Sequence, residues 1–354
     1  MPDIHYNPAN YPHNQNYNKG GDWEATDGAL EVTQKLETPV LYFYSPKAVD
    51  VQVDVKFPHG IVTEVYPNMT DFSPPLHQVE SVANGYAQWK VHVHDPTTVL
   101  DVPQVEADSI WAPSRRVQAN MLNYKNETEH LIFYRGLGQW QGQLRVTSDY
   151  NTLTVNNHGK EAVPAVFLIE TTRGGGAIRS LGSVQASGSI STQIRGEHLG
   201  DRMLPMDLHE TRCQVLLEAA LMEAGLFPLE ARAMVETWTR SYFKSSGIRV
   251  LYVLPRSWTD DILPIHITPK PDALERVLVG RVEVLPFAQE KRLADSLAML
   301  PANINAADLS AAFEGMGVPS LGRFADSKLR RAAQVADKPH LRELIDSYIA
   351  GLNQ

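Results

Sequence analysis

The feature that most constrains this chain is an alternation of apolar and polar residues, which recurs in short segments between positions 31 and 195. In segment 85–94, every second residue is apolar: Ala87, Trp89, Val91 and Val93. Such alternation predicts a β-strand with one buried and one solvated face. Because turn residues separate these short segments, we expect antiparallel sheets packed as a β-sandwich. The remaining segments of this kind are 39–45, 50–58, 61–67, 130–136, 143–149, 151–157 and 162–172.

The stretch 208–255 has a different pattern, in which two helical segments precede one apolar strand. The first helix is apolar nearly all round, which predicts a buried helix. We expect Asp207 and Glu210 to cap its start and Gly225 to end it. The apolar run 248–254 predicts a strand covered on both faces. The second helix carries an apolar stripe with helical spacing, formed by Ala231, Met234, Val235, Trp238 and Tyr242.

These patterns predict a mainly β fold with an α+β portion, divided into four parts. Residues 1–29 form an extended arm, 30–200 an antiparallel β-sandwich region, 201–285 an α+β unit of two helices and a strand, and 286–354 a small helical domain. The arm is rich in Asn and in aromatic residues, which gain much from burial. We therefore expect it to pack against its own surface or a neighbouring chain through Tyr6, Tyr11, Tyr17 and Trp23.

Composition and motifs exclude several classes of function. The chain of 354 residues has a formal net charge of −9, which argues against a nucleic-acid partner and against an anionic membrane surface. No stretch reaches the ~18–20 apolar residues of a membrane span. The single cysteine, Cys213, permits no internal disulfide. No nucleotide-binding or hydrolase motif occurs, and we predict no cofactor.

Five segments carry a family resemblance: GLFPLEARAMVETWTRSYF, RVLYVLPRSWTDDILPIHITP and VLVGRVEVL, with PVLYFYS upstream and LGRFADSKLRRA downstream. Together they resemble a family of uncharacterised bacterial exported proteins. The resemblance covers most of the chain and implies a periplasmic or extracellular protein, without implying an activity. The N-terminus has no basic segment followed by an apolar one, so we expect the chain to be the mature form of an exported protein.

His92 and His94 are the candidate metal ligands of this sequence. They lie two residues apart on the solvated face of one predicted strand, a spacing that can seat a metal ion. A metal site needs a third ligand, however, and the sequence does not place one. The simpler interpretation is a pair of surface histidines, and we predict no bound metal.

The first helix carries two further candidates. Glu218 sits in mid-helix with apolar neighbours on both sides, where desolvation would suit a general acid. The alternative for Glu218 is a structural ion pair with an arginine. His209 and Cys213 lie four residues apart, so they can share a metal or form an activated thiolate pair. Ordinary packing in the core is the simpler interpretation of this pair.

The segment 256–261 follows the apolar strand and is predicted to be a loop, a place where binding and catalytic residues concentrate. Arg256 and Trp258 are its candidate ligand-binding residues. Asp260 and Asp261 are its candidate catalytic carboxylates. The alternative is a capped turn in which the tryptophan is packed.

Three functions fit these observations. The first is a non-catalytic exported protein that mediates binding or assembly, with a protein partner or with itself. It is favoured by the absence of a catalytic signature, by the aromatic arm and by the β-rich N-terminal half of the chain. The first alternative is a hydrolase, with or without a metal, whose site lies near Glu218 or the 256–261 loop. The second alternative is a carbohydrate-binding module that uses exposed Tyr86 and Trp140.

Overall fold

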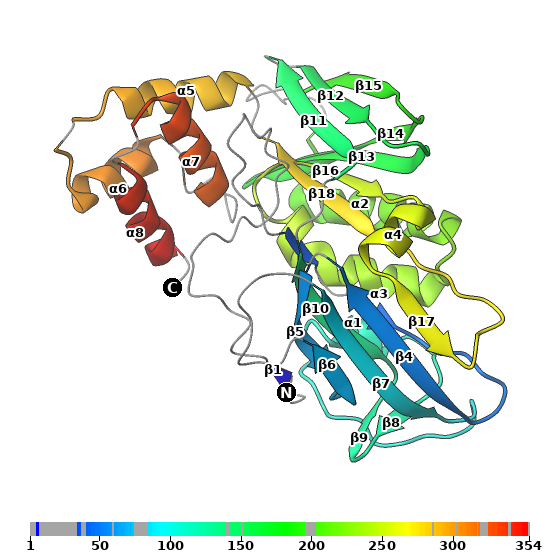
Figure 1. Cartoon of the computed structure of the whole chain (residues 1–354). Coiled ribbons are helices and arrows are strands. Elements are labelled where there is room, and N and C mark those ends of the chain that lie inside the picture. Colours follow the sequence, from blue (N-terminus) through cyan, green and yellow to red (C-terminus); the bar gives the residue numbers. More distant parts are fainter. Residues whose placement is uncertain are drawn as a thin grey trace.

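The computed structural model describes most of the chain from residue 40 onward. The described residues are 5–6, 34–36, 40–58, 60–73, 84–138, 142–149, 152–194, 203–284, 287–301, 303–316, 318, 325–338 and 341–352. Most of the predicted arm lies outside these residues, as do Tyr11, Tyr17, Trp23 and Trp140. The predicted class is confirmed, because the chain is mainly antiparallel β with several helices at its C-terminal end (Figure 1).

Two antiparallel sheets form a β-sandwich. The first has the order β1–β5–β10–β2, with β3 beside β10, and the second has the order β17–β4–β7–β8–β9, with β6 beside β7. The strands of the first sheet are β1 (His5–Tyr6), β2 (Gln34–Leu36), β3 (Val40–Leu41), β5 (Gly60–Tyr66) and β10 (Ile132–Gly138). Those of the second are β4 (Val49–Phe57), β6 (Asp71–Ser73), β7 (Gly85–Val93), β8 (Leu122–Tyr124), β9 (Glu127–Glu129) and β17 (Ile265–Thr268). A short helix, α1 (Ala112–Arg115), precedes β8.

The core of the sandwich follows the predicted alternation along β7. Ala87, Trp89, Val91 and Val93 are buried, whereas the residues between them are partly or fully exposed. The indole N–H of Trp89 donates to the carbonyl oxygen of Pro67 at 3.0 Å, so its polar atom is satisfied inside the core. The prediction of a half-buried strand is therefore confirmed for this segment.

A second body is built on the sheet β14–β13–β16–β18. A smaller sheet, β11–β12–β15, covers one of its faces, and α2 and α3 cover the other (Figure 1). Val250 and Tyr252 therefore face the small sheet, while Leu251 and Val253 face the helices, as expected for the predicted strand 248–254 covered on both faces. The strands are β11 (Leu144–Asp149), β12 (Thr152–Asn157), β13 (Val163–Thr172), β14 (Gly175–Val184), β15 (Ser189–Gln193), β16 (Gly247–Val253) and β18 (Val279–Val284).

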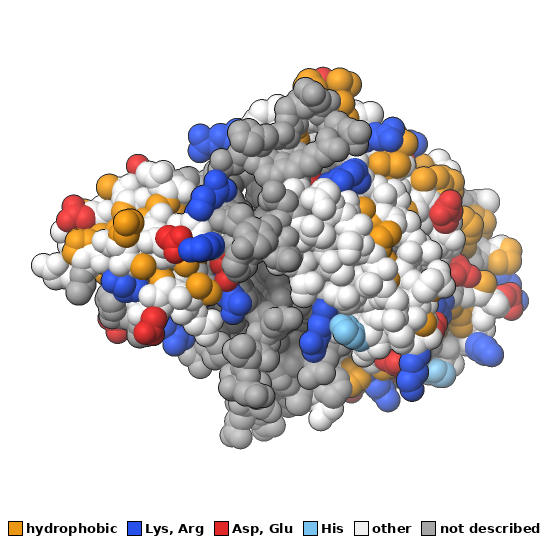
Figure 2. Space-filling view, turned by 90° about the horizontal axis from the view of Figure 1, so that it is seen from above, with side chains coloured by type: hydrophobic (Ala, Val, Ile, Leu, Met, Phe, Trp, Pro, Cys, Tyr) orange, Lys and Arg blue, Asp and Glu red, His pale blue; other side chains and the backbone are white. Residues whose placement is uncertain are grey.

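The outer face of the small sheet is polar but largely uncharged. Seen from above, the surface over β11, β12 and β15 shows few charged and few hydrophobic side chains (Figure 2). By contrast, the helices at the other side of this view carry charged side chains of both signs. The outward residues of β12 and β15 are Thr152, Thr154, Asn156, Ser189, Ser191 and Gln193.

Two strand pairings join parts of the chain that the sequence patterns treat separately. β13 lies in the predicted sandwich region, yet it pairs along its length with β16 of the predicted α+β unit. β17, which lies in the same predicted unit, pairs with β4 of the sandwich. The sheets are thus shared between the predicted parts of the chain.

Helix α2 (Met206–Glu223) differs from its prediction in two respects. Its cap is Pro205, without a side-chain hydrogen bond, because the helix begins one residue before Asp207. Glu210 does not reach back to cap the helix but pairs with Lys244 at 2.9 Å. The predicted end is confirmed, since Gly225 has a φ of +113°, a conformation that favours glycine.

The prediction that this helix is buried all round is wrong. One face packs against the central sheet through Cys213, Leu217, Ala220 and Leu221. Another face is open, with exposed fractions of 53% for Leu208, 59% for Val215 and 42% for Met222. Hydrophobicity alone therefore overestimates how much of the helix the rest of the chain covers.

The second helix, α3 (Pro228–Trp238), continues into a π-helical turn, η2 (Thr239–Phe243). Its predicted stripe is confirmed, because Ala231, Val235, Trp238 and Tyr242 are buried and Met234 is partly buried against them. The rings of Trp238 and Tyr242 stack with centroids 5.5 Å apart. Burial of this stripe is what holds α3 and η2 on the central sheet.

Four helices with their own apolar core follow the sheets in the described part of the chain. They are α5 (Phe287–Ala298), α6 (Ala306–Gly315), α7 (Ala325–Val335) and α8 (Arg342–Leu352). The side chain of Asn305 caps α6 by accepting from the backbone N–H of Asp308 at 2.9 Å. None of the helices in the described ranges is both long and apolar enough to cross a membrane.

A buried group of charges joins α7 to the central sheet. Arg249 Nε lies 3.3 Å from Glu283 Oε1, and Arg281 Nε lies 3.5 Å from the same oxygen. A β-carbon at Gly247 would lie 3.2 Å from Arg249 Nη2, 3.5 Å from Lys328 Nζ and 3.9 Å from Glu283 Oε2, so the three groups meet at this glycine. Gly247 has a φ of +132°, which other residues rarely adopt.

Burial decides the ionisation of Lys328. Loss of solvation lowers its pKa to about 8; the Glu283 charge opposes this shift and the Arg249 charge adds to it. The unfolded chain, with an ordinary lysine pKa near 10.5, therefore binds more protons than the folded chain between about pH 8 and pH 10.5. Folding stability should rise with pH across this window.

In a Lys328→Met variant, we expect that folding stability no longer rises with pH across this window. The free energy of unfolding of the unmodified protein should increase from pH 8 to pH 10 relative to the variant, by about 2 kcal/mol. Urea denaturation at each pH measures the difference. Lys291→Met, which removes an exposed lysine paired with Asp295, is the control and should keep the slope of the parent. Parallel pH profiles for Lys328→Met and its parent would contradict the prediction.

Candidate functional site

The outer face of the sheet β17–β4–β7–β8 is a continuous polar surface. The apolar side chains of these strands point into the sandwich core, so the residues that alternate with them point outward. Cross-strand register aligns the outward residues in rows. One row holds His266, Asp54, Gln88 and Asp71, the next Thr268, Gln52 and Lys90, and the third Asp50, His92 and Asn123.

Asp54 is the centre of a hydrogen-bonded group on this face. Its Oδ1 accepts from the Tyr86 hydroxyl at 2.6 Å and from the Gln88 amide at 2.7 Å, and its Oδ2 accepts from the Gln52 amide at 2.9 Å. The Gln88 amide also lies 2.7 Å from the Tyr86 hydroxyl. Four side chains from two strands are thus held in one orientation, with few rotamers left to lose on binding a ligand.

The ionisation states of this group follow from its geometry. Partial burial alone would raise the pKa of Asp54, but the hydrogen bonds from Tyr86, Gln52 and Gln88 outweigh it and lower the pKa below its ordinary value. Desolvation, with the hydrogen bond to Asp54 next, raises the pKa of Tyr86 to about 12. At neutral pH the face therefore presents an ionised carboxylate bonded to a neutral phenol.

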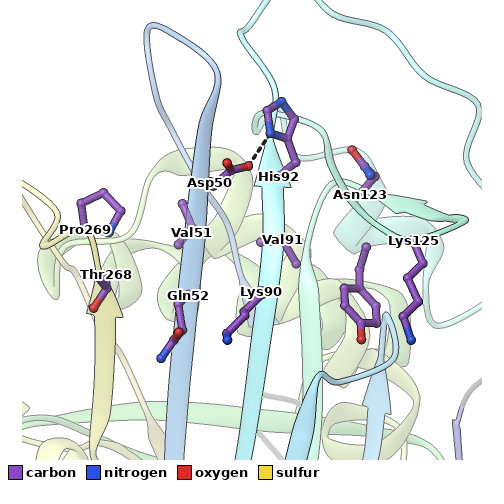
Figure 3. A pocket seen from close by; sticks show the side chains of 11 residues that line it. Asp50, Val51, Gln52, Lys90, Val91, His92, Asn123, Lys125, Thr268 and Pro269 are labelled. Carbon is purple, nitrogen blue, oxygen red and sulfur yellow. Dashed lines mark hydrogen bonds and ion pairs between the residues drawn. The ribbon is translucent and has the colours of Figure 1, made fainter.

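A groove of about 520 Å³ crosses the same face (Figure 3). Asp50 and His92 stand together at one end, and Gln52, Lys90 and Lys125 lie further along it. Carboxylate, amide, hydroxyl and ammonium groups line the groove, together with one tyrosine. Its lining residues are Asp50, Val51, Gln52, Lys90, Val91, His92, Asn123, Tyr124, Lys125, Thr268 and Pro269.

His92 and His94 both lie on this face, as the strand pattern predicts. His92 Nδ1 lies 2.7 Å from Asp50 Oδ1, and His94 Nε2 lies 2.7 Å from Asn123 Oδ1. The two rings meet edge to face with centroids 4.7 Å apart. Within the described part of the chain, no three or more His, Cys, Asp or Glu side chains are grouped to hold a metal ion.

The segment 256–261, predicted as a loop, is a short helix, α4 (Arg256–Ile262), which begins directly after Pro255. Arg256 Nε donates to both oxygens of Asp260 at 3.0 and 2.9 Å, and Arg276 Nη1 donates to Asp260 Oδ1 at 2.6 Å. The Asp260 carboxylate is therefore held between two guanidinium groups. A β-carbon at Gly159 would lie 2.2 Å from Trp258 Cζ2, so this indole ring covers the glycine backbone. The remaining candidate, Asp261, is exposed.

The three candidate residues on α2, Glu218, His209 and Cys213, are each paired or packed against other side chains of the protein. Glu218 is partly buried and its Oε2 lies 3.9 Å from Arg232 Nε on α3, which is the ion-pair alternative of the sequence analysis. His209 is buried, with Thr171 Oγ1 3.3 Å from its Nε2 and Cys213 Sγ within 3.8 Å of its ring nitrogens. Burial lowers the pKa of His209 and raises that of Cys213 to about 12, so the thiol stays protonated and unreactive.

Most of the polar face was not predicted as a site. Five outward residues of two predicted strands were not singled out as candidates, namely Asp50, Gln52, Asp54, Gln88 and Lys90. The signal for them was present, because an alternating strand defines its outward face as clearly as its core face. The contributions of His266 and Thr268 could not be found in this way, since β17 joins the sheet from a distant part of the chain.

Comparison with known proteins gives little guidance. Neither a protein-family model nor a curated protein matches this sequence. A solved structure of the Amycolatopsis orientalis exo-chitosanase CsxA is 14% identical, with 45% of this chain and 20% of that chain covered and a TM-score of 0.12. Its complex with PNP-beta-D-glucosamine is 12% identical, with 80% and 34% covered and a TM-score of 0.13. The chain spans about a third or less of these structures, and such similarity assigns neither a fold family nor an activity.

Proposed function

We propose that this protein is a non-catalytic binding protein, and that the groove on the outer face of β17, β4, β7 and β8 binds a carbohydrate chain. The observation that carries the proposal is the oriented polar group around Asp54 on the same face as an open groove. The family resemblance supports a place of action in the periplasm or outside the cell.

The chemistry of the face suits a ligand rich in hydroxyl groups. A hydroxyl both donates and accepts, so it is best matched by carboxylate, amide and hydroxyl groups that stand side by side. Asp54, Gln52, Gln88 and Thr268 supply these groups from three adjacent strands. Because the side chains of Gln52 and Gln88 are already hydrogen-bonded to Asp54, little of their rotamer entropy is lost when a ligand binds.

The alternative of a hydrolase receives less support from the geometry. Its proposed carboxylates, Glu218 and Asp260, each lie beside arginine side chains of neighbouring segments. A general acid must instead reach the reacting bond of a bound substrate. The groove on the outer face contains Asp50, whose carboxylate is paired with His92 at one end.

Binding to a panel of polysaccharides tests the proposal. The unmodified protein should be retarded in affinity gels, or should co-sediment, with at least one of cellulose, chitin, xylan, starch, alginate and polygalacturonate. Gln52→Ala should weaken this binding about tenfold, because it removes one groove amide and one hydrogen bond of the Asp54 group.

The control is Thr154→Ala on the outer face of the small sheet, where the threonine hydroxyl lies 2.9 Å from that of Ser191. It removes a comparable exposed side chain and should leave binding unchanged. The proposal fails if no polysaccharide of the panel is bound, or if Gln52→Ala binds as tightly as Thr154→Ala.

A further inference from the structure

Two lysines line the groove described above. Lys90 lies at an outward position of β7, and Lys125 lies in the turn that joins β8 to β9. Two positive charges along one open groove favour an anionic ligand there.

Neither lysine has a carboxylate partner in the part of the chain that the structure describes. Lys125 Nζ lies 5.0 Å from the centre of the Tyr124 ring, a cation–π contact that leaves its N–H donors available. Lys90 is exposed beside Gln52, and both ammonium groups line the groove. Asp50 is the one carboxylate among the lining residues, and it is already bonded to His92 at 2.7 Å.

The turn between β8 and β9 fixes the place of Lys125. Tyr124 pairs with Glu127, so Lys125 and Asn126 form a two-residue hairpin loop, and the φ of +52° at Lys125 is the left-handed conformation that such loops use. In this position Lys125 lines the groove.

We propose that the ligand of this groove is an acidic polysaccharide, and that Lys90 and Lys125 bind its carboxylate groups. The inference rests on the proposed carbohydrate-binding function and narrows it to one ligand class. Thr268, Gln52 and Lys90 lie in one row, so hydroxyl-matching and anion-binding groups follow one another across β17, β4 and β7. A chain of uronic acid units carries both the hydroxyl and the carboxylate groups that this row would bind.

Polygalacturonate and its methyl ester are the decisive pair of probes, because they share one backbone and differ in charge. We expect the full-length protein to bind polygalacturonate or alginate at least tenfold more tightly than the ester, with affinity that falls as salt is added. Lys90→Met and Lys125→Met should each lower the affinity for the acidic chain about tenfold. Lys90→Arg should restore most of it.

The matched control is Lys56→Met. Lys56 is an exposed lysine on the same face of β4, outside the groove lining, so its removal changes the net charge equally. It should leave the affinity for the acidic chain within about twofold of the parent.

The outcomes separate this inference from the function on which it rests. Equal binding of polygalacturonate and its ester, or binding only of neutral polysaccharides, overturns the acidic ligand and leaves carbohydrate binding in place. An equal loss of affinity in Lys56→Met and Lys90→Met also overturns it, because only net charge would then matter. If no polysaccharide of the panel is bound, both proposals fail.

Discussion

Replacing Glu283 with leucine is expected to destabilise the folded protein by about 3–5 kcal/mol. Glu283 is the carboxylate that faces Arg249 and Arg281 in the central sheet and Lys328 of α7. Burial raises the pKa of Glu283, while the charges of Arg249, Arg281 and Lys328 oppose the rise. Without this carboxylate, two guanidinium groups that cannot lose their protons are left close together in the interior.

Urea denaturation of the variant and its parent measures this loss. Asp295→Asn is the control, because it breaks an exposed pair with Lys291 and should cost less than about 1 kcal/mol. Combining Glu283→Leu with Lys328→Met should recover part of the stability, since one of the opposed cations is then gone. A loss of stability below about 1 kcal/mol for Glu283→Leu would show that the buried cations of Arg249, Arg281 and Lys328 are compensated by groups other than Glu283.

The second large effect is expected for Trp238→Ala, at about 3–5 kcal/mol. The indole is 6% exposed and stacks on Tyr242, so its removal leaves a cavity between α3, η2 and the central sheet. The same denaturation experiment measures the change. Met222→Ala on the open face of α2 is the control and should alter stability by about 0.5 kcal/mol or less. Equal losses for the two variants would contradict the burial difference between them.

The elements of this fold could be predicted from the sequence wherever one periodic pattern decided the burial of a segment. The alternation in β7 and the stripe of α3 are of this kind, because a strand or helix with one apolar face has one way to bury it. The continuous apolar run of β16 also predicted its environment, with sheet on one side and helices on the other.

The pairing of distant strands could not be predicted in the same way. Nothing in segment 265–268 indicates that Ile265 and Ile267 lie beside Val55 and Val53 rather than beside a strand of the second body. The open face of α2 was missed for a related reason. Leu208, Val215 and Met222 are as apolar as the buried residues of the helix, and only the arrangement of its neighbours leaves them exposed.

The candidate site was found only in part. His92 and His94 were placed on a solvated face, and the structure adds Asp50 and Asn123 as their partners. Of the Asp54 group only Tyr86 was a candidate, because the other members are ordinary polar residues of alternating strands. The group becomes recognisable only when cross-strand register brings Asp54, Tyr86 and Gln88 together.

The pairing of β17 with β4 has a consequence for synthesis on the ribosome. β4 ends at Phe57, whereas its edge partner begins at Ile265, so the sandwich emerges long before its sheet can be completed. Until then the N–H and C=O groups along one side of β4 have no strand to pair with, and an open edge of this kind invites pairing with another chain. Nascent chains and proteolytic fragments that end before β17 should thus be the forms most prone to aggregate.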